Sequence, residues 1–264
     1  DDGFSIKKKS SNEIVISIHI TNVSILLDYY NIWELLGDRI STIYLPNKKL
    51  HMLPNILSNN LCSLLEHKKR VVLTLDIIID SINHDIIDYS FSNNLVKVSK
   101  NYSYGNKDLY KNTCYKLLYK TIVEMNNKNN YIDNIKDDHD VIAYLMILMN
   151  YISSKRLIEI KKGIYRSVLV DSNFKLPEDI SSDIKQFLIG WNTTFNKYTN
   201  FENYKPHQIL KLSSYTQISS PIRRLIDLIN MISIQNELKT LYNLGNFYEK
   251  WIQRIDYLNN NMKK

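Results

Sequence analysis

The segment Ser219-Ser220-Pro221-Ile222-Arg223-Arg224 combines residue types that can hold a phosphate. Ser220 stands where a helix N-cap residue would stand, and Pro221 where the first helical residue would stand. Cations in a first helical turn oppose the helix dipole unless an anion lies between them and the free N–H groups. Arg223 and Arg224 each carry a guanidinium fork that can bind a phosphate through two hydrogen bonds. The segment therefore predicts a helix start that binds phosphate.

The same residues also fit an interpretation without a ligand. Arg223 precedes Asp227 by four positions, and at this helical spacing the two side chains can form an ordinary surface ion pair. Taken alone, the segment favours the two interpretations about equally. Ser63 and Ser220 have no histidine and aspartate at a recognisable triad spacing, so we do not expect serine-hydrolase chemistry.

The charge balance agrees with an anionic partner. The chain has 264 residues, a net charge of +7 and a pI of about 9.1. Nucleic acid is the commonest anionic partner of a basic domain, although a basic soluble protein without such a partner has the same balance. Glycine and proline are scarce, with 6 and 5 residues, which excludes collagen-like chains and flexible linkers.

The cysteines Cys62 and Cys114 are not arranged as a C-x-x-C pair. We therefore expect neither a zinc site nor a disulfide, but two buried thiols in a reducing compartment and a cytoplasmic location. No apolar run reaches the length of a bilayer span, so we expect no membrane partner. Because the chain begins with Asp1 and not with Met, we expect it to be part of a longer protein.

Two segments have the pattern of β-strands. In residues 13–20 isoleucine recurs at every second position, which is the strand period. Residues 70–80 form a nearly continuous apolar, β-branched run, which predicts a buried strand. Between them we expect a helical patch at 33–39 and a proline-punctuated stretch at 44–54. His19 lies between isoleucines and is expected to be a buried, hydrogen-bonded histidine.

Helices dominate the rest of the chain. An Asn-, Lys- and Asp-rich stretch at 125–138 predicts a solvated loop, and the apolar residues that follow predict a buried helix over 138–159. Further helices are expected around 180–189, from Pro221 onward and over 246–258. Strands early and helices late indicate an α+β fold with a sheet in the N-terminal half and a helical C-terminal third.

The segment from Tyr215 to Arg224, followed by Asp227, closely resembles the signature of the RNB family. These are exoribonucleases of the ribonuclease II and ribonuclease R type, and they include the catalytic subunit of the eukaryotic exosome. Other blocks resemble the family in the same order along the chain, and they are Asp1-Asp2-Gly3-Phe4-Ser5, Ile18-His19-Ile20-Thr21-Asn22-Val23-Ser24, Arg39-Ile40-Ser41-Thr42-Ile43-Tyr44-Leu45-Pro46, Leu61-Cys62-Ser63-Leu64 and Met146-Ile147-Leu148-Met149-Asn150. The resemblance thus covers the chain from end to end.

The resemblance implies a single RNB-type domain over residues 1–264, with a largely antiparallel sheet packed by helices. It implies that the start of this domain and the flanking cold-shock and S1 domains belong to further parts of a longer chain. The implied activity is processive hydrolysis of single-stranded RNA from the 3′ end to nucleoside 5′-monophosphates. The implied cofactor is a divalent metal, Mg²⁺ (or Mn²⁺).

The resemblance also implies roles for individual residues. Asp1 and Asp2 match two aspartates of the metal site, and carboxylate oxygens are the ligands that Mg²⁺ prefers. Arg223 is expected to hold the scissile phosphate and offset its developing negative charge. Tyr104 matches a tyrosine that stacks on a base, although a packing role fits it about as well. The other residues that we expect to bind RNA are Arg224 and Ser220.

Some positions depart from the family pattern near the expected chemistry. Ala143 and Tyr144 stand where the family has a Glu-Glu pair, and Asn22 replaces an aspartate. Two hypotheses follow. The first is a divergent, metal-dependent 3′-to-5′ exoribonuclease domain. The second is a catalytically inactive RNB-like domain that binds RNA or a protein, and the number of carboxylates at the metal site distinguishes the two.

Overall fold

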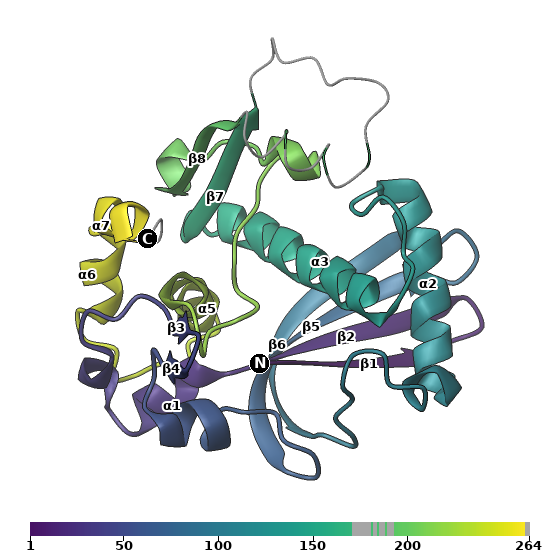
Figure 1. Ribbon diagram of the computed structural model, residues 1–264, viewed down its shortest axis with the longest axis horizontal. Coiled ribbons are helices and arrows are strands. Elements are labelled where there is room, and N and C mark those ends of the chain that lie inside the picture. Colours follow the sequence, from purple (N-terminus) through teal and green to yellow (C-terminus); the bar gives the residue numbers. More distant parts are fainter. Residues whose placement is uncertain (171–180, 182–183, 185–187, 189–192, 262–264) are drawn as a thin grey trace.

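The computed structural model describes residues 1–170, 181, 184, 188 and 193–261. The strands are β1 (Asp2–Lys8), β2 (Glu13–Thr21), β3 (Ile43–Leu45), β4 (Lys48–Leu50), β5 (Lys69–Asp80), β6 (Ile86–Lys97), β7 (Ile164–Val170) and β8 (Thr193–Asn200). The α-helices are α1 (Val23–Tyr29), α2 (Thr113–Asn129), α3 (Asp138–Glu159), α5 (Leu225–Glu237), α6 (Phe247–Ile252) and α7 (Ile255–Asn261). Figure 1 shows the long strands with α2 and α3 on one side of the molecule, and α1, α5, α6, α7 and the β7–β8 pair on the other.

The main sheet has the strand order β1-β2-β5-β6, and every neighbouring pair is antiparallel. Alternate residues of a strand point to one face, and in β2 this face carries the predicted isoleucines, all of which are buried. On β5 the buried face carries Leu73, Leu75, Ile77 and Ile79. Both predicted strands are confirmed, and so is the expected fold class, with an antiparallel sheet in the N-terminal half and helices in the C-terminal part.

Helix α3 packs between the sheet and α2 and is buried on most of its sides, as its sequence predicted. Among the described helices it alone has the length and apolar composition that could cross a membrane, so one segment does reach that length. However, 56% of its apolar window is buried inside the protein. Its contacts with α2, α5 and the sheet are those of a core helix.

Helix α5 is buried on all sides from Leu225 to Gln235, so other elements surround it, and its polar side chains need partners within the protein. Met231 and Ile234 join the cluster that lies between the main sheet, α2 and α3. Leu225, Leu228 and Ile229 join a second cluster with residues of α1 and α6. The helix thus connects the two hydrophobic cores.

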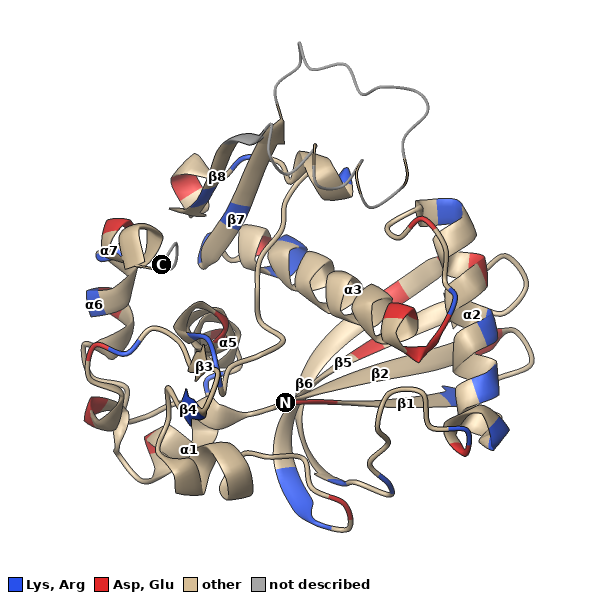
Figure 2. Cartoon of the chain, in the orientation of Figure 1, with Lys and Arg blue, Asp and Glu red and all other residues tan. Residues whose placement is uncertain are grey.

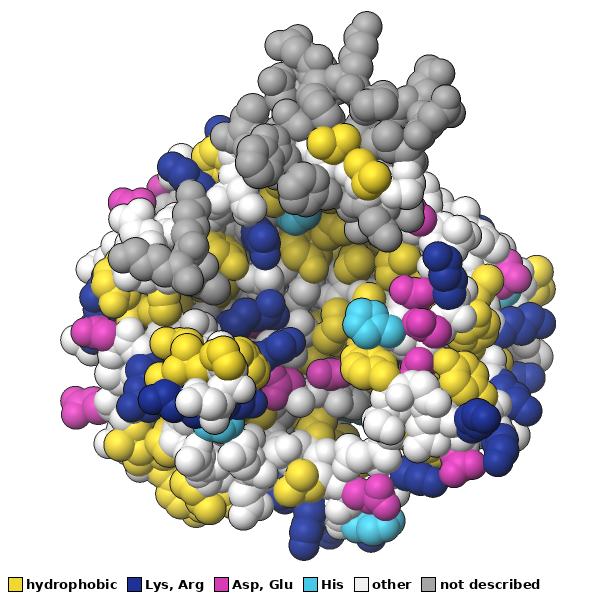
Figure 3. Space-filling view, viewed as in Figure 1, with side chains coloured by type: hydrophobic (Ala, Val, Ile, Leu, Met, Phe, Trp, Pro, Cys, Tyr) yellow, Lys and Arg dark blue, Asp and Glu magenta, His cyan; other side chains and the backbone are white. Residues whose placement is uncertain are grey.

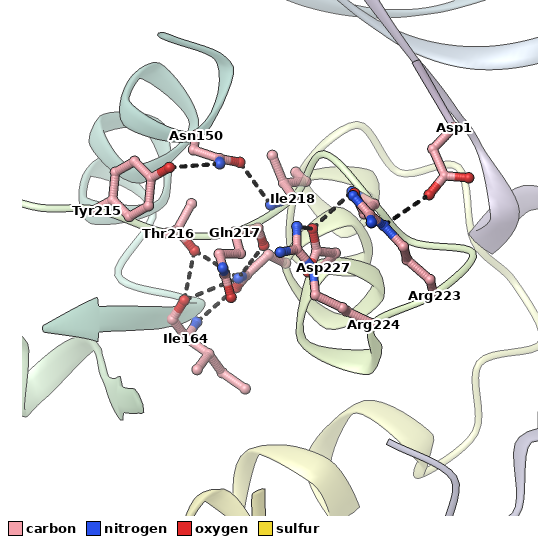
Figure 4. Close-up of polar contacts among 12 residues, drawn as sticks. Asp1, Asn150, Ile164, Tyr215, Thr216, Gln217, Ile218, Arg223, Arg224 and Asp227 are labelled. Atoms are coloured by element: carbon pink, nitrogen blue, oxygen red, sulfur yellow. Dashed lines mark hydrogen bonds and ion pairs between the residues drawn. The ribbon is translucent and has the colours of Figure 1, made fainter. Parts of the chain in front are cut away.

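A buried amide fixes α5 to β7. Asn230 is fully buried, and its Nδ2 donates to Ile164 O at 3.0 Å, to Thr216 Oγ1 at 2.6 Å and to Gln217 O at 2.9 Å. Its Oδ1 accepts from Ile164 N at 2.7 Å. One side chain thus joins α5, β7 and the segment 215–217, whose Thr216 and Gln217 are drawn beside Ile164 in Figure 4.

Some elements differ from the expectations. Residues 125–129 belong to α2 and not to a loop, because the helix continues until Asn130 ends it in the left-handed conformation. The proline-punctuated stretch contains the antiparallel hairpin β3–β4, and the helix expected over 246–258 is divided into α6 and α7. The helix expected around 180–189 lies largely outside the described residues.

Replacing Asn230 by alanine is expected to lower the free energy of unfolding by about 2–4 kcal/mol, because it leaves the buried N–H group of Ile164 without a partner and removes the bonds to Thr216 and Gln217. Asn236→Ala is the matched control, since Asn236 is an exposed residue of the same helix and its replacement should change stability by less than about 0.5 kcal/mol. Urea denaturation of both variants measures the difference. Equal stabilities would show that the amide does not hold these elements together.

Candidate functional site

Asp1 and Asp2 lie where β1 begins, near the centre of the molecule (Figure 2). Asp2 pairs with Ile20 in the ladder between β1 and β2, and Asp1 O accepts a hydrogen bond from Thr21 N at 2.9 Å. The two side chains are 17% and 31% exposed. The sheet therefore fixes the backbone of both aspartates and leaves their carboxylates accessible to a ligand.

A turn over residues 220–223 brings Arg223 to Asp1. Arg223 N donates to Ser220 O at 3.1 Å, and Thr42 N donates to Arg223 O at 2.9 Å. Arg223 Nη2 donates to Ser220 Oγ at 2.9 Å, and Arg223 Nε lies 3.7 Å from Asp1 Oδ2 (Figure 4). The Arg223 side chain is 52% exposed, so its guanidinium keeps donors for a ligand.

The helix start expected at Pro221 is wrong. Helix α5 begins at Leu225, and Arg224 before it is extended, with φ −134° and ψ 126°. Arg224 forms a β-bridge with Ser41, and Leu225 N donates to Ile40 O, so pairing with a distant segment overrides the local helix-start signal. A phosphate at this segment would therefore meet arginine side chains and not the free N–H groups of a helix.

Arg224, and not Arg223, forms the ion pair with Asp227. Arg224 Nη2 donates to Asp227 Oδ1 at 2.7 Å, and Ser220 N donates to the same oxygen at 2.8 Å. Burial opposes the charge of Arg224, but the Asp227 carboxylate outweighs burial, so the pKa of Arg224 lies above its ordinary value. Asp227 is fully buried and orients both Arg224 and the turn, which leaves Arg223 to face Asp1. RNA binding by Arg224 and Ser220 stays a prediction.

The two aspartates and Arg223 line one polar cavity of about 380 Å³. Lys49 and Tyr44 from the β3–β4 hairpin also line it, together with His51. His51 Nδ1 is buried and has no hydrogen-bond partner among the described residues, so it is free to bind a polar ligand. Figure 3 shows a hollow near the middle of this face, with acidic and basic side chains around it. Two anionic and two cationic groups around one space suit a ligand that combines a phosphate with a cation.

Tyr44 lines this cavity, and Tyr104 is a second exposed tyrosine that is not part of the lining. Tyr44 is 61% exposed and carries Lys49 Nζ at 5.0 Å above its ring. Tyr104 is 64% exposed and packs against His139 with ring centroids 5.1 Å apart. Partial burial and the Asp2 carboxylate raise the pKa of Tyr104. Open aromatic faces beside charged groups are what a stacking platform for bases requires.

Lys49 and Tyr44 are not among the site residues expected from the sequence. A signal for them exists, because Lys48-Lys49 follows the Tyr-Leu-Pro motif and basic residues beside an aromatic one are typical of a nucleic-acid surface. The sequence does not predict how the β3–β4 hairpin folds, and it is this fold that places Lys49 at the cavity.

The departures from the family pattern have structural roles. Asn22 is fully buried and caps α1, where its Oδ1 accepts from Ile25 N at 3.3 Å. Tyr144 is fully buried in the core under the sheet, and its hydroxyl accepts a hydrogen bond from Asn129 Nδ2 at 3.1 Å. Neither side chain lines the cavity at Asp1 and Asp2.

Asp1 and Asp2 are the carboxylates of this cavity, and they are the residues that could hold a metal ion there. No group of three or more His, Cys, Asp or Glu side chains that could hold a metal occurs in the described part of the chain. Mg²⁺ is usually held by one or two carboxylates together with substrate phosphates and water. The aspartate pair therefore fits an ion that binds together with a phosphate, and it does not fit a closed structural metal site.

Comparisons with known proteins agree with the motif resemblance. Residues 1–116 match the RNB domain family. Ribonuclease R 2 of Lactococcus lactis is 31% identical over 107 residues, which are 40% of this chain and 16% of that protein. The resemblance to the RNB family is confirmed, and the chain spans a small part of the length of this curated relative.

Solved structures share the fold over nearly the whole chain. Mycoplasma genitalium RNase R in complex with ribose-methylated single-stranded RNA matches with a TM-score of 0.77 and 20% identity, over 98% of this chain and 51% of that one. Yeast Ssd1, a pseudonuclease, matches with a TM-score of 0.80 and 13% identity, over 98% of this chain and 40% of that one. The fold is that of RNB exoribonucleases, and it occurs in nucleases and in a pseudonuclease alike.

His207 is a buried histidine with packing and hydrogen-bonding contacts. It is 8% exposed, packs on Tyr215 with ring centroids 5.0 Å apart, and accepts a hydrogen bond from Leu210 N at 3.4 Å. Burial and the nearby Arg166 lower its pKa to about 4.

Because the folded protein disfavours protonated His207, its contribution to stability should be complete above its unfolded pKa of about 6.5 and should be lost as the pH falls towards 4. In the His207→Gln variant this part of the pH dependence should be missing. Unfolding free energies measured between pH 7 and pH 4 provide the comparison. A variant with the same pH profile as the unmodified protein would contradict the assignment.

Proposed function

We propose that this RNB-type chain is a divalent-metal-dependent exoribonuclease domain, which hydrolyses single-stranded RNA from the 3′ end to nucleoside 5′-monophosphates. The observation that carries the proposal is the meeting of Arg223 with Asp1 and Asp2 in one polar cavity. Carboxylates for a metal and a guanidinium for a phosphate are the groups that phosphodiester hydrolysis requires.

Arg223 has the role of holding the scissile phosphate. Ser220 Oγ and Asp1 orient its guanidinium, and its remaining donors are open to the cavity. A guanidinium in this position stabilises negative charge that develops on the phosphate oxygens. Lys49, on β4, adds a second positive charge to the cavity lining.

Asp1 and Asp2 have the role of holding Mg²⁺ or Mn²⁺ beside that phosphate. When bound, such an ion lowers the pKa of a coordinated water and neutralises phosphate charge. The β1–β2 ladder keeps both carboxylates in place without a ligand, because their backbones are hydrogen-bonded or paired to β2.

Tyr44 and Tyr104 have the role of stacking platforms for bases. Every base has a π-face, so stacking binds a strand without regard to its sequence, which an exonuclease needs. Neither ring is buried, and Tyr44 lines the charged cavity, whereas Tyr104 lies outside its lining.

A second candidate function is an RNA-binding module without hydrolysis. It is favoured by the small number of carboxylates, since the described residues contain no cluster of three or more metal-ligating side chains. The fold similarity to yeast Ssd1, a pseudonuclease, is compatible with it. Binding without turnover would distinguish this candidate from the enzyme.

For Arg223→Ala we expect a loss of turnover of about 100- to 1000-fold, because a donor to developing phosphate charge is removed. The measurement is the release of nucleotides from labelled single-stranded RNA by the full-length protein in Mg²⁺ or Mn²⁺. Lys120→Ala removes an exposed charge on α2 and should retain full turnover. No turnover by the unmodified protein at concentrations that bind RNA would overturn the enzyme and support the module.

Replacing Tyr104 or Tyr44 by alanine is expected to weaken RNA binding by about 5- to 150-fold, since stacking on each base contributes about 1–3 kcal/mol. Tyr242→Ala is the control, because Tyr242 is 84% exposed and lies outside the cavity lining. Fluorescence anisotropy with several homopolymers would measure the affinities. Unchanged affinity in both variants would remove the tyrosines from the binding surface.

A further inference from the structure

A second pair of arginines lies beyond Arg223. With the Gln217 amide oriented so that its Nε2 donates to Tyr198 Oη at 2.7 Å, its Oε1 accepts from Arg224 Nη1 at 3.2 Å and from Arg166 Nη1 at 3.3 Å. Arg166 and Tyr198 are direct partners in the β7–β8 ladder, so their side chains share one face. The two guanidinium groups therefore lie side by side on a single oxygen.

One of the two positive charges of this pair is not balanced by an ion pair with the residues around it. Asp227 neutralises Arg224, and its Oδ1 is already shared with Ser220 N. In the described part of the chain no carboxylate forms an ion pair with Arg166. Like charges held together at a partly buried place repel each other unless an anion joins them.

Both arginines also keep unused donors. The Nε atoms of Arg166 and Arg224 are buried and have no hydrogen-bond partner among the described residues. A buried N–H group without a partner is costly, and most such groups in proteins are satisfied. A ligand with several acceptor oxygens and a negative charge would satisfy them, and a phosphodiester has both properties.

The pair continues the line of polar contacts that starts at the cavity. Arg223 contacts Asp1 and Ser220, Ser220 N binds Asp227, and Asp227 binds Arg224, as the dashed contacts in Figure 4 trace in part. Gln217 then connects Arg224 to Arg166. A strand whose phosphate lies at Arg223 thus has a further cationic position next to it.

We propose that Arg166 and Arg224 form a second phosphate site, which holds another phosphodiester of the strand whose scissile phosphate lies at Arg223. The proposal rests on RNA binding at the Arg223 cavity and adds a residue, Arg166, that sequence motifs do not indicate. The second site contributes to the binding of ligands that carry more than one phosphate. A nucleotide with one phosphate, bound at Arg223, does not contact it.

The test uses Arg166→Gln, which removes the charge and keeps a polar side chain. Binding of oligoadenylates to the full-length protein is measured in EDTA at several salt concentrations. We expect affinity to fall by at least about 10-fold and the slope of log K against log salt to decrease by about 0.7, the value for one phosphate contact on a single strand. Adenosine 5′-monophosphate should bind as before, because it has one phosphate.

Two further variants make the result specific. Lys197→Gln removes one charge at the neighbouring ladder position on the opposite face and should change neither quantity. Arg166→Lys keeps the charge without the fork, so it should retain the salt slope and lose affinity. An unchanged slope in Arg166→Gln, or an equal loss in Lys197→Gln, would overturn the second site while leaving the Arg223 cavity intact. Absence of RNA binding by the unmodified protein would instead overturn the proposed function.

Discussion

The buried amide of Asn230 is the constraint on which the rest of the site depends. Backbone groups shielded from water need partners, and without this side chain the N–H group of Ile164 would be unpaired and its carbonyl would keep only the bond from Thr216 Oγ1. The same amide binds Thr216 and Gln217. The strand that carries Arg166, the segment that carries Gln217 and the helix that carries Asp227 are thus fixed relative to one another by a single side chain.

This arrangement gives the adjacent residues Arg223 and Arg224 different binding partners. Asp227 lies in the first turn of α5, where its carboxylate accepts hydrogen bonds from Arg224 and from the N–H group of Ser220. Arg223 is then directed to the opposite side, towards Asp1. The electrostatic pattern of the cavity is therefore decided by a carboxylate that does not line it.

The sequence predicts those parts of the molecule where one local pattern dominates. β2 has the alternating period of a strand, whereas β5 and α3 have long apolar runs, and burial follows directly from these patterns. The start of α5 is different, because Arg224 pairs with Ser41 and this distant contact prevails over the Ser-Pro signal. Motif blocks in the sequence predict Asp1, Asp2 and Arg223 as members of one site. Lys49 reaches the cavity only because the β3–β4 hairpin folds back on it, and no local sequence pattern specifies where a hairpin folds back.

The anionic and cationic halves of the cavity are supported by different parts of the fold. Asp1 and Asp2 belong to the edge of the main sheet, and Arg223 belongs to a turn held by Thr42 and α5. The backbone hydrogen bonds that hold each half come from its own part of the fold, and the two halves meet at the contact between Arg223 and Asp1. Mutation can therefore remove the carboxylates while the backbone bonds of the turn at Arg223 remain. A domain that cleaves a nucleic-acid strand thus has a short evolutionary route to a domain that only binds one. The reverse change would require new ligands to arise at the end of a strand.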